Sequence, residues 1–102
     1  MNERPRWTLG AFAVIRDDEG GVLLSHRTDR EVWNLPGGLV EHYELPSEAV
    51  VREVWEETGL TVEVDRLVGV YGKRGQSDLV FCFECRVVGG QLAPSTEADR
   101  HE

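Results

Sequence analysis

The sequence of 102 residues has few cysteines and lacks any apolar run close to the roughly 20 residues that a membrane span needs. Two cysteines are too few for a disulfide framework, and no export signal is recognisable. These absences exclude a disulfide scaffold and a protein anchored by apolar helices. We therefore expect one small domain, residues 1–102, in the reducing cytoplasm, with no membrane partner.

Positive charge is also scarce, because 11 lysines and arginines face 19 acidic residues, which gives a net charge of -8. Such a chain repels polyanions, so we expect no nucleic acid polymer as a partner. A small phosphorylated ligand remains compatible with this charge if cations bridge the repulsion.

The two cysteines, Cys82 and Cys85, have the C-x-x-C spacing of redox and zinc sites. Residues 79–88 are rich in strand formers, however, and side chains three apart on a strand point to opposite faces. We therefore interpret both as inert cysteines of a strand.

The N-terminal half predicts a strand pair followed by a shaped loop. Residues 8–16 and 22–27 are rich in strand formers, and residues 17–21 between them have the composition of a hairpin turn. Residues 28–38 show no clear period and end in Leu35-Pro36-Gly37-Gly38, which predicts a loop of fixed shape.

Residues 47–58 predict a helix, since its apolar residues recur at helical spacing and Gly59 stands at the expected stop. Its apolar positions are Val50, Val51, Val54 and Trp55. The start is open, because Pro46 in the first turn makes Leu45 the cap, whereas Ser47 is the better capping residue.

The C-terminal half predicts strands at residues 61–64, 67–71 and 79–88, the last two joined by a polar loop at 72–77. Residues 91–102 are polar and acidic, so by composition they are interpreted as a tail. The chain has no internal repeat.

Three glutamates of the helix carry the chemistry of this sequence. Glu53, Glu56 and Glu57 stand at positions i, i+3 and i+4, on one side of a helix and within reach of a common ion. The alternative is a solvated helix face, with Arg52 offsetting part of the repulsion through Glu56. Clustered carboxylates suit Mg²⁺ or Mn²⁺, and Gly37-Gly38 is where the backbone can approach a ligand closely.

The segment 38–60 resembles the Nudix box, the signature of the Nudix hydrolase family. Nine positions match its spacing, and a random window would do so less often than about once in ten million. The approach Trp33-Asn34-Leu35-Pro36-Gly37-Gly38 and the preceding strands are similar to the family too. The matching residues are Gly38, Glu44, Arg52, Glu53, Val54, Glu56, Glu57, Gly59 and Leu60.

The resemblance implies an α/β (α+β) Nudix fold, a mixed β-sheet sandwiched between helices. It also implies roles for individual residues. Glu56 and Glu57 resemble the principal metal ligands, and Glu53 a further ligand or the catalytic base. Arg52 would orient these carboxylates, and Gly38 would lend a carbonyl to the metal. Glu44 and Gly37 would support the loop.

Four residues outside the box are weaker candidates. Glu97 stands about where many relatives keep an acidic residue over the metals, so it is a second candidate for the base. Trp33 is a candidate for stacking on a base, although packing is its commoner use. Lys73 and Arg74 lie in a loop and are candidates for contact with substrate phosphate, against the alternative of solvated charge.

The implied function is metal-dependent hydrolysis of the pyrophosphate linkage of a nucleoside diphosphate joined to another moiety. A catalytically silent nucleotide-binding module is the alternative, followed by another chemistry on the same fold. Relatives usually continue into a helix that covers the second sheet face, and this helix is missing here. We therefore expect a homodimer that covers that face, or a chain truncated at its C-terminus.

Overall fold

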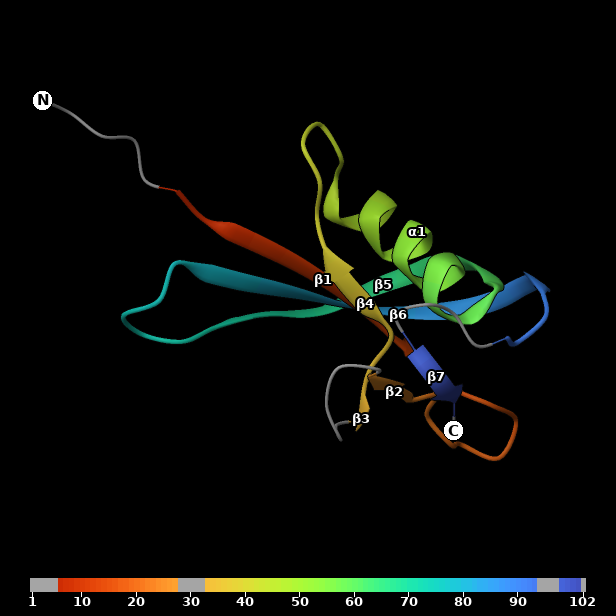
Figure 1. The fold of residues 1–102 in the computed structure, drawn as a ribbon. Helices are drawn as coiled ribbons and strands as arrows, with labels where there is room; N and C mark the ends of the chain where they lie inside the picture. The colour runs from red at the N-terminus through yellow and green to blue at the C-terminus, as the bar shows by residue number, and fades with distance from the viewer. Residues whose placement is uncertain (1–5, 28–32, 94–97, 102) are drawn as a thin grey trace, which may run out of the picture.

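The structure, a computed structural model, describes residues 6–27, 33–93 and 98–101. Its largest sheet has the strand order β4-β1-β6-β5 (Figure 1). β1 pairs in parallel with β6, while the β1–β4 and β5–β6 pairs are antiparallel. The sheet is mixed, which confirms the expected fold class. Its strands are β1 (Thr8–Ile15), β4 (Gly37–Leu39), β5 (Leu60–Gly72) and β6 (Asp78–Gly90).

A second, smaller sheet has the order β3-β2-β7. It consists of β2 (Ser25–Arg27), β3 (Trp33–Asn34) and β7 (Ala98–His101), with β7 antiparallel to β2. The interpretation of residues 91–102 as a tail is therefore wrong for their last part. Backbone pairing with β2 forms this strand, and composition carries no signal of such pairing.

The expected strand pair at residues 8–27 is also wrong in part. Only an isolated bridge, Arg16 with Val22, joins the two segments directly after the turn. β4 and β6 are the strand neighbours of β1, and β2 pairs with β3 and β7 in the small sheet instead. The turn itself is as expected, since Asp17 accepts hydrogen bonds from the amides of Glu19 and Gly21.

Two further predictions of local structure need correction. Residues 28–38, expected as a loop, contain β3 and the start of β4. Residues 61–64 and 67–71, expected as two strands, belong to the single strand β5. The register of β5 against β6 shifts at three places between Thr61 and Gly69. These irregularities explain why the sequence pattern predicted two strands instead of one.

The helix α1 (Pro46–Thr58) confirms the expected helix and decides where it starts. Leu45 is the N-cap, and its amide donates to Glu48 Oε1 at 2.8 Å. Gly59 ends the helix in a left-handed conformation, φ 78°. Glycine adopts this conformation without strain because it has no Cβ. No helix in the described ranges is both long and apolar enough to span a membrane.

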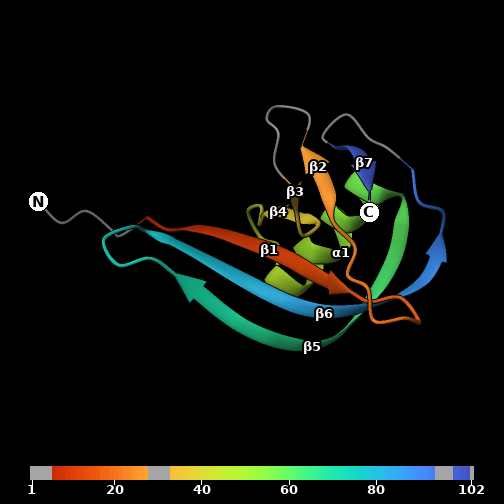
Figure 2. The ribbon, with the colours of Figure 1, turned by 90° about the horizontal axis from the view of Figure 1, so that it is seen from below.

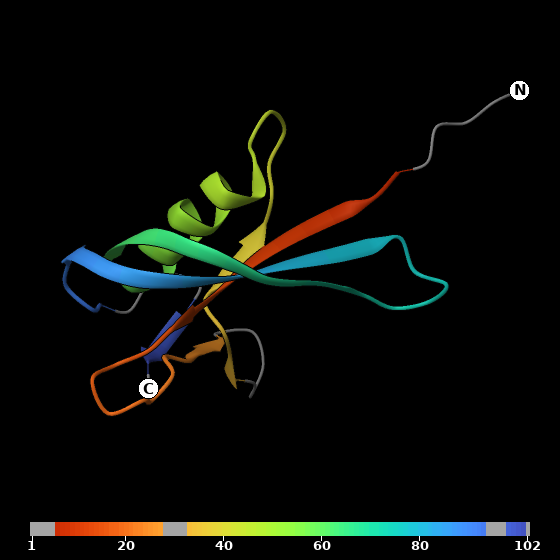
Figure 3. The same ribbon diagram turned by 180° about the vertical axis from the view of Figure 1, so that it is seen from behind.

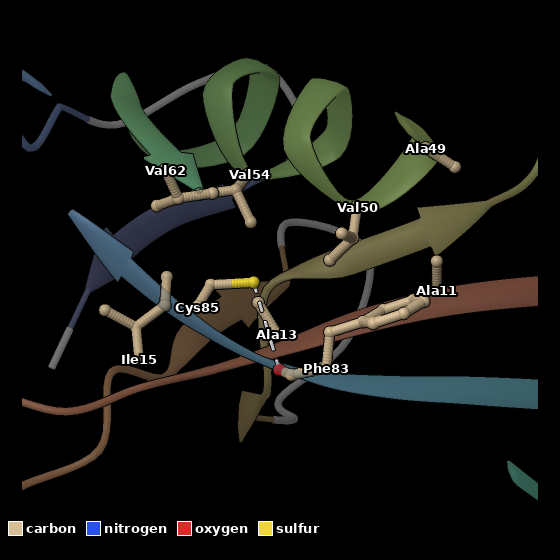
Figure 4. Close-up of a cluster of buried hydrophobic side chains, with 9 residues drawn as sticks. All are labelled: Ala11, Ala13, Ile15, Ala49, Val50, Val54, Val62, Phe83 and Cys85. Atoms are coloured by element: carbon tan, nitrogen blue, oxygen red, sulfur yellow. Dashed lines mark hydrogen bonds between the residues drawn. The ribbon is translucent and has the colours of Figure 1, made fainter. Parts of the chain in front are cut away.

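The core lies between α1 and the face of the sheet beneath it (Figure 4). Val50 and Val54 of α1 are fully buried against Ala11 and Ala13 of β1, whose small side chains let the helix approach closely. Trp55, which the helical spacing placed on the apolar stripe, is 60% exposed, because it follows Val54 around the helix away from the sheet. Trp55 is therefore not a core residue.

The cysteines lie on opposite faces of β6, as expected. Cys85 belongs to the core beneath α1, whereas Cys82 is paired in register with Gly69 on the opposite face. Both are free thiols. Burial raises the pKa of Cys85 to about 11 and also raises the pKa of Cys82, so both thiols are poor nucleophiles near neutral pH.

The face of the sheet opposite α1 carries cross-strand ion pairs beside its apolar residues. Glu84 of β6 binds both Arg16 and Arg66, at 3.3 and 3.0 Å. Arg86 binds Asp65 and Glu63 of β5. In this region of the face for which we expect a cover, charged side chains meet the solvent.

One end of the hairpin formed by β5 and β6 extends well beyond α1 (Figures 2 and 3). We call residues 67–80 the projecting arm; they comprise the end of β5, the turn and the start of β6. Leu67, Val68, Val70 and Tyr71 are each between 41% and 55% exposed there. These exposed apolar side chains of the sheet thus lie away from the helix.

Candidate functional site

The two glycines of β4 bring its backbone unusually close to neighbouring elements. A Cβ on Gly37 would overlap the backbone of β1 at Ala11 and Phe12, and a Cβ on Gly38 would overlap the carboxylate of Glu53. Any larger residue would push β4 away from β1 or displace the glutamate. The glycine pair therefore lets helix, strand and carboxylate meet at one place.

Two glutamates of α1 are directed at this strand. Glu53 and Glu57 are each only 8% exposed. Glu57 Oε2 accepts a hydrogen bond from the amide of Gly37 at 3.0 Å, which fixes this carboxylate against β4. Buried carboxylates require such partners, since desolvation disfavours the charged form. The helix thus presents two acidic groups at the backbone of the glycine pair.

Arg52 connects the loop before α1 to the helix. Its guanidinium forms a two-pronged contact with Glu44, Nε to Oε2 at 2.8 Å and Nη2 to Oε1 at 3.0 Å. Nη1 donates to Glu53 at 2.8 Å and to Glu56 at 2.9 Å. A planar donor fork suits this arrangement, which a lysine has no means to reproduce.

The charges in this cluster shift each other's ionisation. The hydrogen bond to Arg52 lowers the pKa of Glu44, assisted by the backbone amide of Glu41. The hydrogen bond to Glu44 in turn raises the pKa of Arg52, with further contributions from Glu53 and Glu56. Arg52 and Glu44 therefore favour each other's charged form and tie loop and helix together.

Two further contacts of Arg52 were not predicted from the sequence. Its Nη2 donates to the carbonyl of Leu39 at 2.9 Å, and its Nε lies 3.2 Å from Glu41 Oε1. A carbonyl contact has no side-chain signature. Glu41 is visible in the sequence as an acidic residue three positions before Glu44. Only the folded loop shows that both carboxylates reach the guanidinium of Arg52.

The oxygen ligands at this place suit a hard divalent cation. Glu53, Glu56 and Glu57 supply carboxylate oxygens, and the glycine pair of β4 lies close against Glu53 and Glu57. No group of three acidic, histidine or cysteine side chains is preassembled for a metal in the part of the chain that the structure describes. Arg52 instead occupies oxygens of Glu53 and Glu56.

The candidates outside the box lie apart from this cluster or outside the described residues. Lys73 and Arg74 stand in the turn of the projecting arm, at the end of the hairpin that points away from α1 (Figure 1). Trp33 belongs to β3, and only its backbone is described. Glu97 lies outside the described residues.

Comparison with known proteins identifies close relatives. The NUDIX domain model matches residues 6–102. The chain is 44% identical over 94 residues to a MutT-like protein of Streptomyces ambofaciens, which covers 92% of this chain and 61% of that protein. It is 42% identical over 91 residues to an 8-oxo-dGDP phosphatase of Homo sapiens, covering 86% of this chain and 28% of that one.

Solved structures agree with this result. The structure of an ADP-ribose pyrophosphatase from Streptococcus suis matches with a TM-score of 0.83 at 31% identity, over 93% of this chain and 71% of that chain. The chain spans about three fifths of the length of the MutT-like protein. Sequence and fold therefore lead to the same group of proteins.

Proposed function

The chain belongs to the Nudix family, and from that premise we propose that it is a divalent-metal-dependent hydrolase that cleaves a pyrophosphate linkage. The substrate is a nucleoside diphosphate joined to another moiety. The observation that carries the proposal is the convergence of the carboxylates of Glu53 and Glu57 on the glycine pair of β4, with Glu56 bound to the neighbouring Arg52.

Mg²⁺ or Mn²⁺ is the cofactor in this proposal, held by Glu56 and Glu57 with Glu53 and the carbonyl of Gly38. When bound, such a cation neutralises charge on the pyrophosphate and lowers the pKa of a water ligand. The burial of Glu53 and Glu57 supports this assignment, because carboxylates shielded from solvent bind a divalent cation more strongly than solvated ones.

Arg52 and Glu44 position the ligands in this proposal. Without a cation, the guanidinium offsets repulsion between Glu53 and Glu56 and keeps both side chains in place. Glu44 holds Arg52 from the opposite side, and Gly37 restrains Glu57 through its amide. The carboxylates are thus ordered before substrate arrives, which reduces the reorganisation that catalysis requires.

The base that removes a proton from the attacking water is Glu53 or Glu97. Glu53 is supported by its burial beside Gly38, in the same cluster as the other ligands. Glu97 rests on its place in the sequence after the last long strand and stays a prediction. A correctly placed base contributes about two to four powers of ten to the rate.

The proposed substrate class follows from the names of relatives and from charge. The human and streptococcal proteins are named for 8-oxo-dGDP and ADP-ribose, both nucleoside diphosphate compounds. A net charge of -8 disfavours a nucleic acid polymer as partner, whereas a cation bridges the site to a small nucleotide. We place the protein in a reducing cytoplasm because two cysteines are too few for a disulfide framework.

A panel of nucleoside diphosphate compounds with Mg²⁺ or Mn²⁺ tests the proposal, with released phosphate and nucleotide as the readout. Glu56→Gln keeps the shape of the side chain and removes its charge, so we expect turnover to fall at least about a hundredfold. Glu48→Gln is the matched control, because Glu48 stands in the first turn of the same helix and only caps Leu45.

The outcomes separate the alternatives. Binding of nucleotide and cation without cleavage of any compound would make the domain a nucleotide-binding module. Cleavage that Glu56→Gln leaves unchanged would disprove the ligand assignment while keeping the reaction class. Equal losses in Glu56→Gln and Glu48→Gln would indicate damage to the helix, which circular dichroism detects independently.

A further inference from the structure

Every nitrogen of the Arg52 guanidinium has acceptors, and some of them are oxygens that the proposed cation needs. Nη1 donates to Glu53 Oε1 at 2.8 Å and lies 2.9 and 3.2 Å from the two oxygens of Glu56. Nε and Nη2 donate to Glu44, and Nη2 also donates to the carbonyl of Leu39. Arg52 therefore holds carboxylates that are proposed as ligands of the metal.

A divalent cation bound by Glu53 and Glu56 competes with Arg52 for the same oxygens. An arginine stays protonated in a protein, so its positive charge remains close to the charge of the cation. Repulsion between such charges is strong where solvent is largely excluded, and the side chains of Arg52 and Glu53 are only 27% and 11% exposed. Arg52 therefore requires negative charge on its other side while a cation is bound.

Glu44 has little further capacity to supply that charge. Its two oxygens already accept hydrogen bonds from Nε and Nη2 of Arg52, and Oε1 also accepts one from the amide of Glu41 at 3.0 Å. The side chain of Glu44 is 16% exposed, so it has little room to move. Glu44 fixes the guanidinium, but a further carboxylate has to compensate a change in its surroundings.

Glu41 places a second carboxylate on this side of the guanidinium. Its Oε1 lies 3.2 Å from Nε of Arg52, while the Nε proton is donated to Glu44 at 2.8 Å. The side chain of Glu41 is 64% exposed and has room to follow the guanidinium. Its backbone is held independently, because its amide donates to Glu44 and its carbonyl accepts from the amide of Glu44.

We propose that Glu41 is a positioning residue of the metal site, whose carboxylate holds Arg52 when a divalent cation draws Glu53 and Glu56 away from the guanidinium. The inference rests on the proposed function, because it requires these two glutamates to bind the cation. Glu41 touches neither cation nor substrate and acts through Arg52. As an exposed ion pair it contributes little without a cation, and its contribution appears when a cation binds.

Titration calorimetry with Mn²⁺ tests the inference. Glu41→Gln keeps the backbone contacts of the loop and removes the charge, so we expect the Kd for Mn²⁺ to rise about threefold. Glu48→Gln is the matched control, because Glu48 is an exposed glutamate in the first turn of α1 that binds the amide of Leu45. It should leave the Kd for Mn²⁺ nearly unchanged.

Glu41→Asp separates contact with Arg52 from charge alone. Aspartate keeps the charge, but its shorter side chain does not reach Nε, so the Kd for Mn²⁺ should rise as in Glu41→Gln. The unfolding temperature measured without Mn²⁺ should be the same in wild type and both variants. The increase in unfolding temperature on adding Mn²⁺ should be smaller in both variants than in wild type.

The outcomes distinguish this inference from the proposed function. A wild-type protein that binds no Mn²⁺ would overturn both. Binding by wild type with an unchanged Kd in Glu41→Gln would overturn the inference alone. Full affinity in Glu41→Asp would show that charge suffices without contact, and an equal loss in Glu48→Gln would do the same, so either result would overturn it. A lower unfolding temperature of both Glu41 variants without Mn²⁺ would replace the positioning role by a structural one.

Discussion

The half of the main sheet beneath α1 and the projecting arm are built from the same strands but have opposite environments. Beneath the helix, Ala11, Ala13 and Phe83 are buried and the residues are packed against a cover. In the arm, Leu67, Val70 and Tyr71 of equally apolar composition remain exposed. Burial is decided by what lies over a strand more than by the strand's own composition, so sequence alone does not separate the two halves.

The same comparison holds for charge. Near α1, a single guanidinium holds Glu44, Glu53 and Glu56 in place through contacts of 2.8 to 2.9 Å. Towards the arm the ion pairs end with Arg66, and residues 67–72 carry no charge. The first region is ordered for chemistry on a charged ligand, whereas the second presents backbone and apolar side chains.

The largest effect is expected for Arg52→Lys. Lysine has no fork with which to bind Glu44 on one side and Glu53 and Glu56 on the other, so the carboxylates lose their alignment. We expect kcat/KM on the best substrate of the panel to fall about a thousandfold. Arg66→Lys, at another arginine–glutamate pair, should leave kcat/KM within about twofold. Similar losses in both variants would contradict the special role of Arg52.

A smaller effect is expected for stability when glycine is replaced by alanine. At Gly37 the new Cβ would overlap the backbone of β1, so Gly37→Ala should cost about 3 kcal/mol of unfolding free energy. At Gly75, in the turn of the arm, space is open and only the left-handed backbone opposes alanine, which predicts about 1 kcal/mol. Urea denaturation compares the two, and equal costs would contradict the close approach of β4.

The smallest effect is expected for Glu84→Gln on the face opposite α1. Hydrogen bonding to Arg66, and also to Arg16, lowers the pKa of Glu84, so its ionised form favours the folded state. That contribution is present above the carboxyl's ordinary pKa of about 4.3 and is lost as the pH falls through the lowered value. The difference in denaturation midpoint between wild type and variant should therefore shrink on acidification. A difference that stays constant across the acidic range would contradict this role of the ion pairs.

The helix and its glutamates were predictable because their signals are local. Helical spacing and the stop at Gly59 define α1 to within one residue of its observed start at Pro46. Helical geometry alone predicts that Glu53 and Glu57 lie on the same side of α1. What the sequence did not reveal is that β4 comes close enough for the amide of Gly37 to bind Glu57. That contact depends on strands distant in the chain.

The sheet was less predictable, because pairing is decided between segments. β7 has no strand composition and exists through its pairing with β2. β2 was expected beside β1, yet both edges of β1 are occupied by other strands. The register shifts of β5 divided one strand into two apparent ones. In each case the missing information is the identity of a partner, which no local window contains.

The parallel pairing of β1 with β6 has a consequence for the order in which the chain folds. Thr8 pairs with Asp78 and Ile15 with Cys85, so β1 waits for a strand that is synthesised much later than itself. The antiparallel pair of β5 and β6 forms from neighbouring residues and closes a short loop, whereas seating β1 requires closure of most of the chain. On the ribosome, β1 therefore remains unpaired on this edge until β6 has emerged, and its insertion between β4 and β6 completes the core as a late step.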